Sequence, residues 1–292
     1  MRDEEAKATA PHQRAEGMVP RFVYGTAWKE EATTALTGQA LACGFRAIDT
    51  ANQRKHYFEE GVGAAVAAAI ARGELTRAQL LLQTKFTYAR GQDHRLPYQA
   101  NASPAQQVRQ SFASSLEHLR TDRLDCYLLH GPERASGLTA VDGEVWRAMS
   151  ELAQAGQTAR LGISNVTAQQ LSALCALAER DGLVRPTFVQ NRCYARRGWD
   201  REVRAVCRDE GIVYQGFSLL TANPHVVASA AVIRAAERRG ASPAAIVFRF
   251  ALDEEMLPLT GTTSAQHMRD DLAALALAPL DAAERRALLD LG

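Results

Sequence analysis

The chain has 292 residues, of which 47% are hydrophobic and 23% charged, and its 34 basic and 33 acidic side chains leave a formal net charge of +1. This composition is ordinary for a globular protein of one or two domains. So balanced a charge gives no electrostatic reason to expect nucleic acid or an anionic membrane as a partner. No apolar run approaches the roughly 20 residues that span a bilayer. Segment 1–18 is charged and lacks the apolar core of a secretory signal. We therefore expect a cytoplasmic protein with a disordered tail over 1–18 and one folded domain over 19–292.

The five cysteines are scattered along the chain, odd in number and without a CxxC pair. Three fall in helical patterns and two in apolar strands, as buried free thiols do. This distribution is typical of a reducing compartment and argues against a disulfide framework or a zinc knuckle. The seven histidines show no HxH or HExxH spacing, so no metal site is expected.

Short apolar runs alternate along the chain with longer segments whose apolar residues recur about every 3.6 positions. The eight runs cover residues 22–27, 46–51, 80–86, 124–132, 159–164, 188–194, 212–217 and 256–262. Several helical segments end in a glycine that suits a C-terminal cap, namely Gly44, Gly73, Gly156, Gly182 and Gly211. Repeated strand–helix alternation indicates a parallel sheet covered by helices.

Eight such units in about 250 residues predict an α/β protein with the (β/α)8 or TIM barrel fold. A doubly wound open sheet is the alternative, but it usually has a glycine-rich loop after its first strand. The first run here ends in GTAWKE, with a single glycine. Extra helices are predicted near 224–240, before the seventh-unit helix at 243–253, and at the C-terminus over 280–291.

In a barrel of this kind the carboxyl ends of the strands share one rim, where the active site lies. The predicted strand ends carry Asp49, Lys85, His130, Ser164 with Asn165, Gln190 with Asn191, and Phe217 with Ser218. Each has a structural explanation when taken alone, such as a helix N-cap for Asn165. Because all of them fall at the same level of consecutive strands, a shared site is favoured.

Three of these rim residues, Asp49, Lys85 and His130, suit carbonyl chemistry together with Tyr57. Tyr57 stands at the start of the helical pattern that follows the second strand. Asp49 beside Lys85 would hold the ammonium charged, and that charge would lower the pKa of the Tyr57 phenol from about 10 toward neutrality. Such a phenol is a good general acid. A neutral His130 would donate a hydrogen bond to a carbonyl oxygen.

None of the four is a redox centre, so two electrons must come from outside. The amides and hydroxyl of the fifth and sixth strand ends suit a carboxamide, and the Phe217 ring suits the face of a nicotinamide. The residues therefore predict reduction of a small-molecule carbonyl by hydride transfer. A structural alternative stays open, in which Asp49 caps a turn and Tyr57 only packs.

Motifs along the chain resemble those of the aldo-keto reductases, from about Phe22 to Leu275. The matching segments, in the order of the family, are GTAWK, GFRAIDTA, EEGVG, TKF, LDCYLLHGP, ARLGISN, VQNRCY, FSLL and LTGTTS. The resemblance implies a monomeric barrel and a catalytic tetrad of Asp49, Tyr57, Lys85 and His130. It also implies a nicotinamide cofactor bound across the rim, usually NADPH, with NADH as the alternative.

Further positions follow from the resemblance alone. It implies that the cofactor contacts Gly25, Thr26, Ser164, Asn165, Gln190, Asn191, Phe217, Ser218, Leu220, Thr262, Thr263, Ser264, His267, Arg269 and Asp271. The substrate pocket would be lined by Tyr24, Trp28 and Tyr88. Phe217 replaces the tyrosine that usually stacks on the nicotinamide.

The sequence departs from the family pattern in the loop that carries Tyr57. The family's tyrosine usually comes five residues after the aspartate, and Arg54 stands there in this chain. We interpret the later Tyr57 as the result of a three-residue extension of the loop. The altered spacing keeps open a second function, that of a cofactor-binding protein with little turnover that senses redox state or regulates a partner.

A second departure concerns the 2′-phosphate of NADPH. Gly261, Thr262 and His267 stand where many members have lysine, serine and arginine, so the case for a phosphate-selective site is weaker. Arg269 would compensate if it turned inward.

The chain also ends at Gly292, without the C-terminal loop that covers the pocket in longer relatives, and a more open pocket is expected. A phosphate-binding lyase or isomerase is disfavoured, because the tetrad would then have no role.

Overall fold

Eight parallel strands close into a barrel in the order in which they occur along the chain. The structure, a computed structural model, describes residues 20–292, so the tail expected over 1–18 lies outside the described residues. The strands are β1 Val23–Gly25, β2 Ala47–Asp49, β3 Leu81–Phe86, β4 Cys126–Leu129, β5 Leu161–Ser164, β6 Phe188–Arg192, β7 Val213–Phe217 and β8 Leu257–Thr260. Parallel pairing of β1 with β8 completes the ring. The predicted TIM barrel is confirmed.

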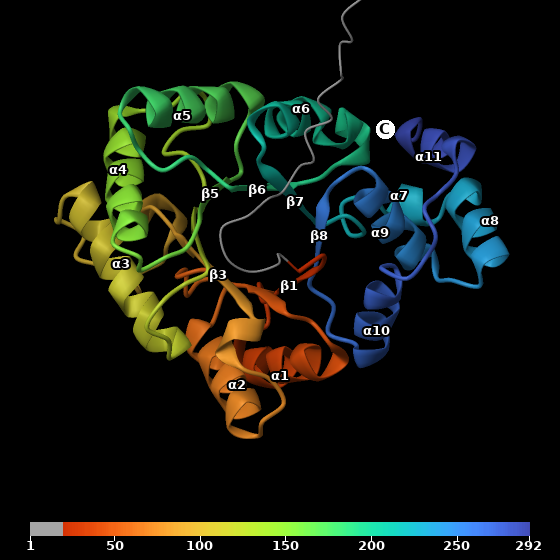
Figure 1. The fold of residues 1–292 in the computed structure, drawn as a ribbon, viewed down its shortest axis with the longest axis horizontal. Helices are drawn as coiled ribbons and strands as arrows, with labels where there is room; N and C mark the ends of the chain where they lie inside the picture. Colours follow the sequence, from red (N-terminus) through yellow and green to blue (C-terminus); the bar gives the residue numbers. More distant parts are fainter. Residues whose placement is uncertain (1–19) are drawn as a thin grey trace, which may run out of the picture.

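Helices surround the barrel, as Figure 1 shows. Those that follow the strands are α1 Thr33–Cys43, α2 Glu59–Ala71, α3 Pro104–Leu119, α4 Ala140–Gln154, α5 Ala168–Arg180, α6 Arg201–Glu210, α9 Pro243–Asp253 and α10 Ala265–Ala273. The extra helices predicted from the sequence are also present. Segment 224–240 holds two of them, α7 Pro224–Val227 and α8 Ala230–Arg239, and the last is α11 Ala282–Leu289.

Side chains at the helix ends explain where the helices begin and stop. The hydroxyls of Ser103, Thr139 and Thr167 cap α3, α4 and α5 by accepting a hydrogen bond from the backbone N–H three residues on. The five glycines predicted as C-terminal caps all have positive φ, from 63° at Gly182 to 114° at Gly44. The local rules of helix capping therefore fix the element boundaries of the barrel.

The period of two along a strand divides its side chains between two cores. A small apolar cluster inside the barrel comprises Val23, Ala47, Leu81, Cys126, Leu128, Phe188 and Leu257. Alternate residues such as Tyr24, Ile48 and Leu82 pack outward in the larger core beneath the helices. The same alternation, continued toward the carboxyl ends, turns Asp49 and Lys85 inward at the rim.

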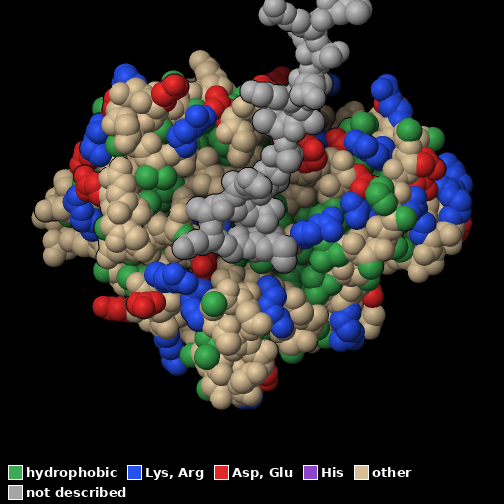
Figure 2. Space-filling model, viewed as in Figure 1, with side chains coloured by type: hydrophobic (Ala, Val, Ile, Leu, Met, Phe, Trp, Pro, Cys, Tyr) green, Lys and Arg blue, Asp and Glu red, His purple; other side chains and the backbone are tan. Residues whose placement is uncertain are grey.

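The outer surface carries charges of both signs. Figure 2 shows Lys and Arg side chains interspersed with Asp and Glu over the surrounding helices, in keeping with the net charge of +1. Among residues 20–292, no helix has the length and apolar character required to cross a membrane. All five cysteines are free, and four of them are buried.

The close approach of α2 to α3 gives a test of the packing. A Cβ at Gly63 would lie 2.1 Å from the carbonyl oxygen of His118 and 2.8 Å from Leu119 Cα. We expect Gly63→Ala to lower the free energy of unfolding by about 1–3 kcal/mol, because backbone atoms have to move.

Gly38, in α1, is the matched control, since a Cβ there meets nothing within 4 Å. Gly38→Ala should raise the free energy of unfolding by about 0.5–1 kcal/mol through helix propensity. Urea unfolding followed by circular dichroism measures both changes. A Gly63→Ala variant as stable as the wild type would contradict the packing described.

Candidate active site

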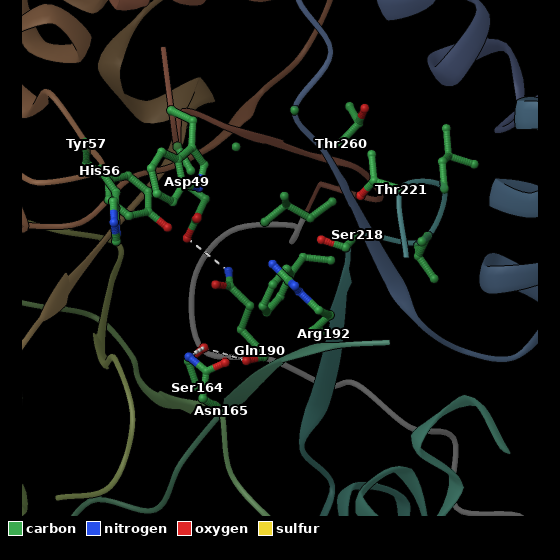
Figure 3. Close-up of a pocket in the computed structure, with 18 of the residues that line it drawn as sticks. Asp49, His56, Tyr57, Ser164, Asn165, Gln190, Arg192, Ser218, Thr221 and Thr260 are labelled. Atoms are coloured by element: carbon green, nitrogen blue, oxygen red, sulfur yellow. Dashed lines mark hydrogen bonds between the residues drawn. The ribbon is translucent and has the colours of Figure 1, made fainter. Parts of the chain in front are cut away.

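A cavity of about 1240 Å³ opens at the carboxyl ends of the strands. Figure 3 shows side chains from different strands converging on it, with Asp49 and Tyr57 on one side and Ser164, Asn165 and Gln190 on another. The cavity therefore lies at the rim that the strand ends predicted. Among residues 20–292 there is no group of three or more His, Cys, Asp and Glu side chains that could hold a metal ion.

An ion pair between Asp49 and Lys85 lies at the bottom of this site. Lys85 Nζ is 2.7 Å from each carboxylate oxygen of Asp49 and donates a third hydrogen bond to the carbonyl oxygen of Thr50, at 2.8 Å. The side chain of Lys85 is 0% exposed and that of Asp49 is 4% exposed. Burial lowers the pKa of Lys85, and the Asp49 carboxylate opposes that shift. Gln83 and Gln190 donate to Asp49 Oδ1 at 2.5 and 3.0 Å, so the carboxylate is saturated with donors.

The structure brings Tyr57 to this pair in spite of its shifted position in the sequence. Lys85 Nζ lies 5.2 Å from the centroid of the Tyr57 ring. The His130 ring packs edge-on against the same tyrosine, with 5.9 Å between centroids. All four residues of the predicted tetrad are thus neighbours at the rim, with Tyr57 in contact with both Lys85 and His130.

Hydrogen bonds hold the extended loop in place. The carbonyl oxygen of Gln53 accepts from the backbone N–H of both His56 and Tyr57, each at 3.0 Å, and its side chain donates to the Gly91 carbonyl oxygen at 2.6 Å. The Trp28 N–H donates to the His56 carbonyl oxygen at 2.7 Å, and their rings stack with centroids 3.9 Å apart. The loop is therefore fixed by contacts with Trp28, after β1, and with Gly91, after β3.

The expected lowering of the Tyr57 pKa is wrong. Burial raises the pKa of the phenol, and the Asp49 carboxylate raises it further. The ammonium of Lys85 does not offset these two effects, because its three hydrogen bonds go to Asp49 and Thr50 and none goes to the phenol oxygen. Tyr57 consequently keeps its proton at neutral pH.

His130 is the second proton-bearing group beside Tyr57. Burial lowers its pKa to about 3, with the positive charge of Lys85 adding to the effect, so the imidazole is neutral as expected. Its Nδ1 lies 2.7 Å from the Thr87 hydroxyl, a contact that the sequence did not indicate. When Thr87 donates this hydrogen bond, the proton of the imidazole resides on Nε2.

Three polar residues form the opposite wall of the cavity. Ser164 Oγ donates to the Gln190 carbonyl oxygen at 2.5 Å, and Asn165 Nδ2 donates to the His130 carbonyl oxygen at 2.8 Å. Within the described chain, no hydrogen bond reaches Asn165 Oδ1 or Gln190 Oε1. The N-cap explanation for Asn165 is wrong, because Thr167 caps α5.

The cavity also receives many of the other residues expected to bind cofactor or substrate. These are Gly25, Trp28, Tyr88, Phe217, Ser218, Leu220, Thr262, Thr263, His267 and Asp271. Burial raises the pKa of Asp271 to about 6, and Thr260 donates a hydrogen bond to its carboxylate at 2.8 Å.

Six of the expected residues do not line the cavity, and one of them is Lys85, which lies beneath it in its bonds to Asp49 and Thr50. Asn191 is bonded to the backbone of Val166 and to Asp200, Tyr24 is buried and donates to the Thr262 carbonyl oxygen, and Thr26 is buried and donates to the Asp49 carbonyl oxygen. Ser264 caps α10. Arg269 is exposed and donates to Gln266, so the inward turn considered for it does not occur.

Four basic side chains that line the cavity were missed from the sequence, namely Lys29, Arg90, Arg134 and Arg192. Lys29 is 7% exposed and donates to the Gly261 carbonyl oxygen at 2.7 Å, and burial lowers its pKa to about 8. Arg192 lies over the Phe217 ring, 5.5 Å from its centroid. The alternation of β6 could have revealed Arg192, since it follows Gln190 by two positions and faces the same way.

The closed ring of eight parallel strands places the chain among the α/β barrels. The chain belongs to the aldo/keto reductase family, whose family model matches residues 23–290. The chain is 31% identical to methylglyoxal reductase DkgA of Escherichia coli strain K12 over 231 residues, 78% of this chain and 73% of that protein. It is 28% identical to an aldo-keto reductase of Mycolicibacterium vanbaalenii over 233 residues, 80% of this chain and 74% of that protein.

Solved structures show the same fold. An aldo-keto reductase from a Medee basin deep-sea metagenome library superposes with a TM-score of 0.80 at 18% identity, covering 94% of this chain and 92% of the other. An aldo/keto reductase from Brucella melitensis gives a TM-score of 0.76 at 23% identity, covering 94% and 95%.

The neutral state of His130 has a measurable consequence. The folded protein resists protonation of this imidazole, whereas the unfolded chain takes up the proton near the usual pKa of about 6.5. Stability contributed by His130 is therefore complete above pH 6.5 and is lost as the pH falls toward 3. We expect NMR titration to find His130 neutral at pH 5, and His130→Asn to lose less stability than the wild type between pH 7.5 and 5. A His130 imidazole that titrates near pH 6.5 would contradict this.

Proposed function

We propose that the protein reduces an aldehyde or ketone to the alcohol, with a nicotinamide cofactor as hydride donor and Tyr57 as general acid. The observation that carries the proposal is the position of the Tyr57 ring, between Lys85 and His130 at the edge of one cavity. Membership of the family and the reductases among its relatives support the same chemistry.

The cavity fits a nicotinamide at the wall formed by β5, β6 and β7. A carboxamide NH2 needs acceptors, and the unpartnered oxygens of Asn165 and Gln190 meet that need on the cavity side. Phe217 lines the same cavity, and because the Arg192 guanidinium covers one face of its ring, the other face would have to receive the nicotinamide. The bound cofactor would supply the hydride, and the protein would supply position and a proton.

Tyr57 and His130 act on the oxygen of the carbonyl group in this proposal. His130, with its proton on Nε2, donates a hydrogen bond that orients and polarises the carbonyl. Tyr57 transfers its proton to the same oxygen as the hydride adds to carbon, so the alkoxide is never released. The transfer leaves Tyr57 as a phenolate, which the nearby Lys85 ammonium would stabilise and which would regain its proton from water once the alcohol leaves.

Tyr57→Phe tests the proton donor. We expect the variant to bind the nicotinamide cofactor with unchanged affinity, because the ring and its packing remain. Its rate of aldehyde reduction should fall by about 10²- to 10⁴-fold or more, the usual contribution of a general acid. Absorbance at 340 nm with methylglyoxal and aromatic aldehydes measures the rate, and fluorescence quenching measures binding.

Full turnover in Tyr57→Phe would contradict the assignment of the acid. If instead the wild-type protein binds cofactor but reduces no aldehyde or ketone in a broad panel, the protein is a cofactor sensor and not a reductase.

We infer NADPH as the cofactor, with NADH as a close competitor. The hydroxyls of Thr262 and Thr263 before α10 support a phosphate site, and His267 lies beside them. Asp270 and Asp271 also line this end of the cavity, however, and their carboxylates would disfavour the 2′-phosphate that distinguishes NADPH from NADH.

We expect a small preference for NADPH, of less than about tenfold in dissociation constant, because Lys29 already donates to the Gly261 carbonyl oxygen and its pKa is lowered to about 8. His267→Arg should widen that preference by adding a guanidinium at the cavity. Arg269→Ala is the matched control and should leave it unchanged, since Arg269 contacts Gln266 outside the cavity. Tighter binding of NADH than of NADPH by the wild type would overturn the choice of cofactor.

The protein would act on a small-molecule carbonyl substrate as a monomer in the cytoplasm, without a nucleic-acid or membrane partner. The near-zero net charge and the free cysteines support this setting.

A further inference from the structure

We propose that the substrate carries an anionic oxygen group, a carboxylate or a phosphate, which Arg90 and Arg134 bind at the mouth of the cavity. This inference rests on the proposed reductase function and specifies its substrate class. Arg90 comes from the loop after β3 and Arg134 from the loop after β4, and both line the same cavity as Tyr57 and His130.

Arg90 is held against the strand end that delivers His130. Its Nη2 donates to the carbonyl oxygen of Pro132 at 2.5 Å, and Pro132 follows His130 by two residues. The short 3₁₀ helix Ala89–Gly91 that carries Arg90 is fixed by the hydrogen bond from Gln53 to Gly91. The guanidinium is therefore anchored beside the group that would contact the carbonyl oxygen.

Arg134 is exposed, but the backbone that carries it is fixed by two buried side chains. Gln170 Nε2 donates to the carbonyl oxygens of Arg134 at 3.1 Å and Gly137 at 2.8 Å. Asp142 Oδ1 accepts from the Glu133 N–H at 2.7 Å. Gln170 and Asp142 are each 1% exposed, so the loop has a rigid base and presents Arg134 to the cavity.

Neither guanidinium has a carboxylate partner within residues 20–292. The nearby acids are engaged elsewhere. Asp49 is paired with Lys85, Asp93 is paired with Arg95, and Asp142 accepts from Tyr88 and from backbone groups. Glu133 precedes Arg134 in sequence but is not among the residues that line the cavity.

The distribution of charge along the cavity separates its two ends. Its carboxylates besides Asp49 are Asp270 and Asp271, which belong to α10 at the opposite end. The lining contributed by the loops after β3 and β4 therefore contains two guanidinium groups and no carboxylate. Guanidinium groups bind carboxylate and phosphate oxygens in a planar, bidentate arrangement, so an anionic substituent on the substrate matches this end.

The test compares charged and neutral substrates of similar shape. The carboxylate arm uses 4-carboxybenzaldehyde against 4-formylbenzamide, and the phosphate arm uses glyceraldehyde 3-phosphate against glyceraldehyde. For the wild type, we expect kcat/KM to be about tenfold or more higher for the anionic member of at least one pair, the size of a charge-assisted hydrogen bond. The arm with the larger ratio identifies the anion.

Arg90→Ala with Arg134→Ala should bring that ratio close to one, and Arg90→Lys with Arg134→Lys should retain part of it. Because both groups are solvent-accessible, the ratio for the wild type should also shrink in 1 M salt. Arg95→Ala is the matched control, since it lies on the same loop but is paired with Asp93 outside the cavity, and its ratio should equal that of the wild type.

Three results overturn the proposal. If the wild type reduces the neutral aldehydes as well as the anionic ones, Arg90 and Arg134 do not form an anion-binding clamp, while the reductase function stands. A double alanine variant that still reduces neutral aldehydes and keeps the wild-type ratio shows that other groups bind the anion. If the wild type reduces none of the four substrates, the reductase function itself fails and the clamp with it.

Discussion

Asp49 and Lys85 form an ion pair inside the mouth of the barrel, where neither side chain has appreciable contact with solvent. Removing two charges from water costs several kcal/mol per ion, so such a pair is stable only when its remaining donors and acceptors are satisfied. Gln83 and Gln190 supply donors to Asp49, and the Thr50 carbonyl oxygen accepts from Lys85. Gln215 links the two glutamines across the barrel. The rim is thus tied together across β2, β3, β6 and β7.

Burial sets the protonation of the two groups beside this pair. Tyr57 stays a neutral phenol because burial raises its pKa, with the Asp49 carboxylate adding to the shift, and His130 stays a neutral imidazole because burial lowers its pKa, with the Lys85 ammonium adding to the shift. Two neutral hydrogen-bond donors therefore lie at the same edge of the cavity. One is the Tyr57 hydroxyl, and the other is His130 Nε2 when Thr87 donates to Nδ1. Negative charge that develops on a carbonyl oxygen there would meet donors already in place and a nearby ammonium, which favours the transition state over the ground state.

Much of the fold could be predicted from the sequence because it follows from local rules. Periodicity located the strands and the helix at 243–253, and glycines marked the helix ends. Asp49, Lys85 and His130 could be predicted as rim residues, since a strand end fixes the position of a side chain in a parallel barrel.

Other features depend on three-dimensional detail. The inward or outward direction of a side chain follows the pleat, which is why Gln190 lines the cavity while the adjacent Asn191 bonds to Asp200 outside it. The pKa of Tyr57 depends on burial, which no motif reveals. The path of the loop to Tyr57 depends on hydrogen bonds that the Trp28 N–H and the Gln53 carbonyl oxygen make within it, and no sequence pattern reveals these bonds.

The central claim is that a substrate carbonyl lies between Tyr57 and His130. A crystal structure with oxidised cofactor and a carbonyl-bearing inhibitor tests this most directly. The account predicts that the carbonyl oxygen lies within about 2.6–3.2 Å of both Tyr57 Oη and His130 Nε2, with the carboxamide of the cofactor against Asn165 and Gln190. A carbonyl oxygen bonded to other groups, with Tyr57 directed away from it, would contradict the account.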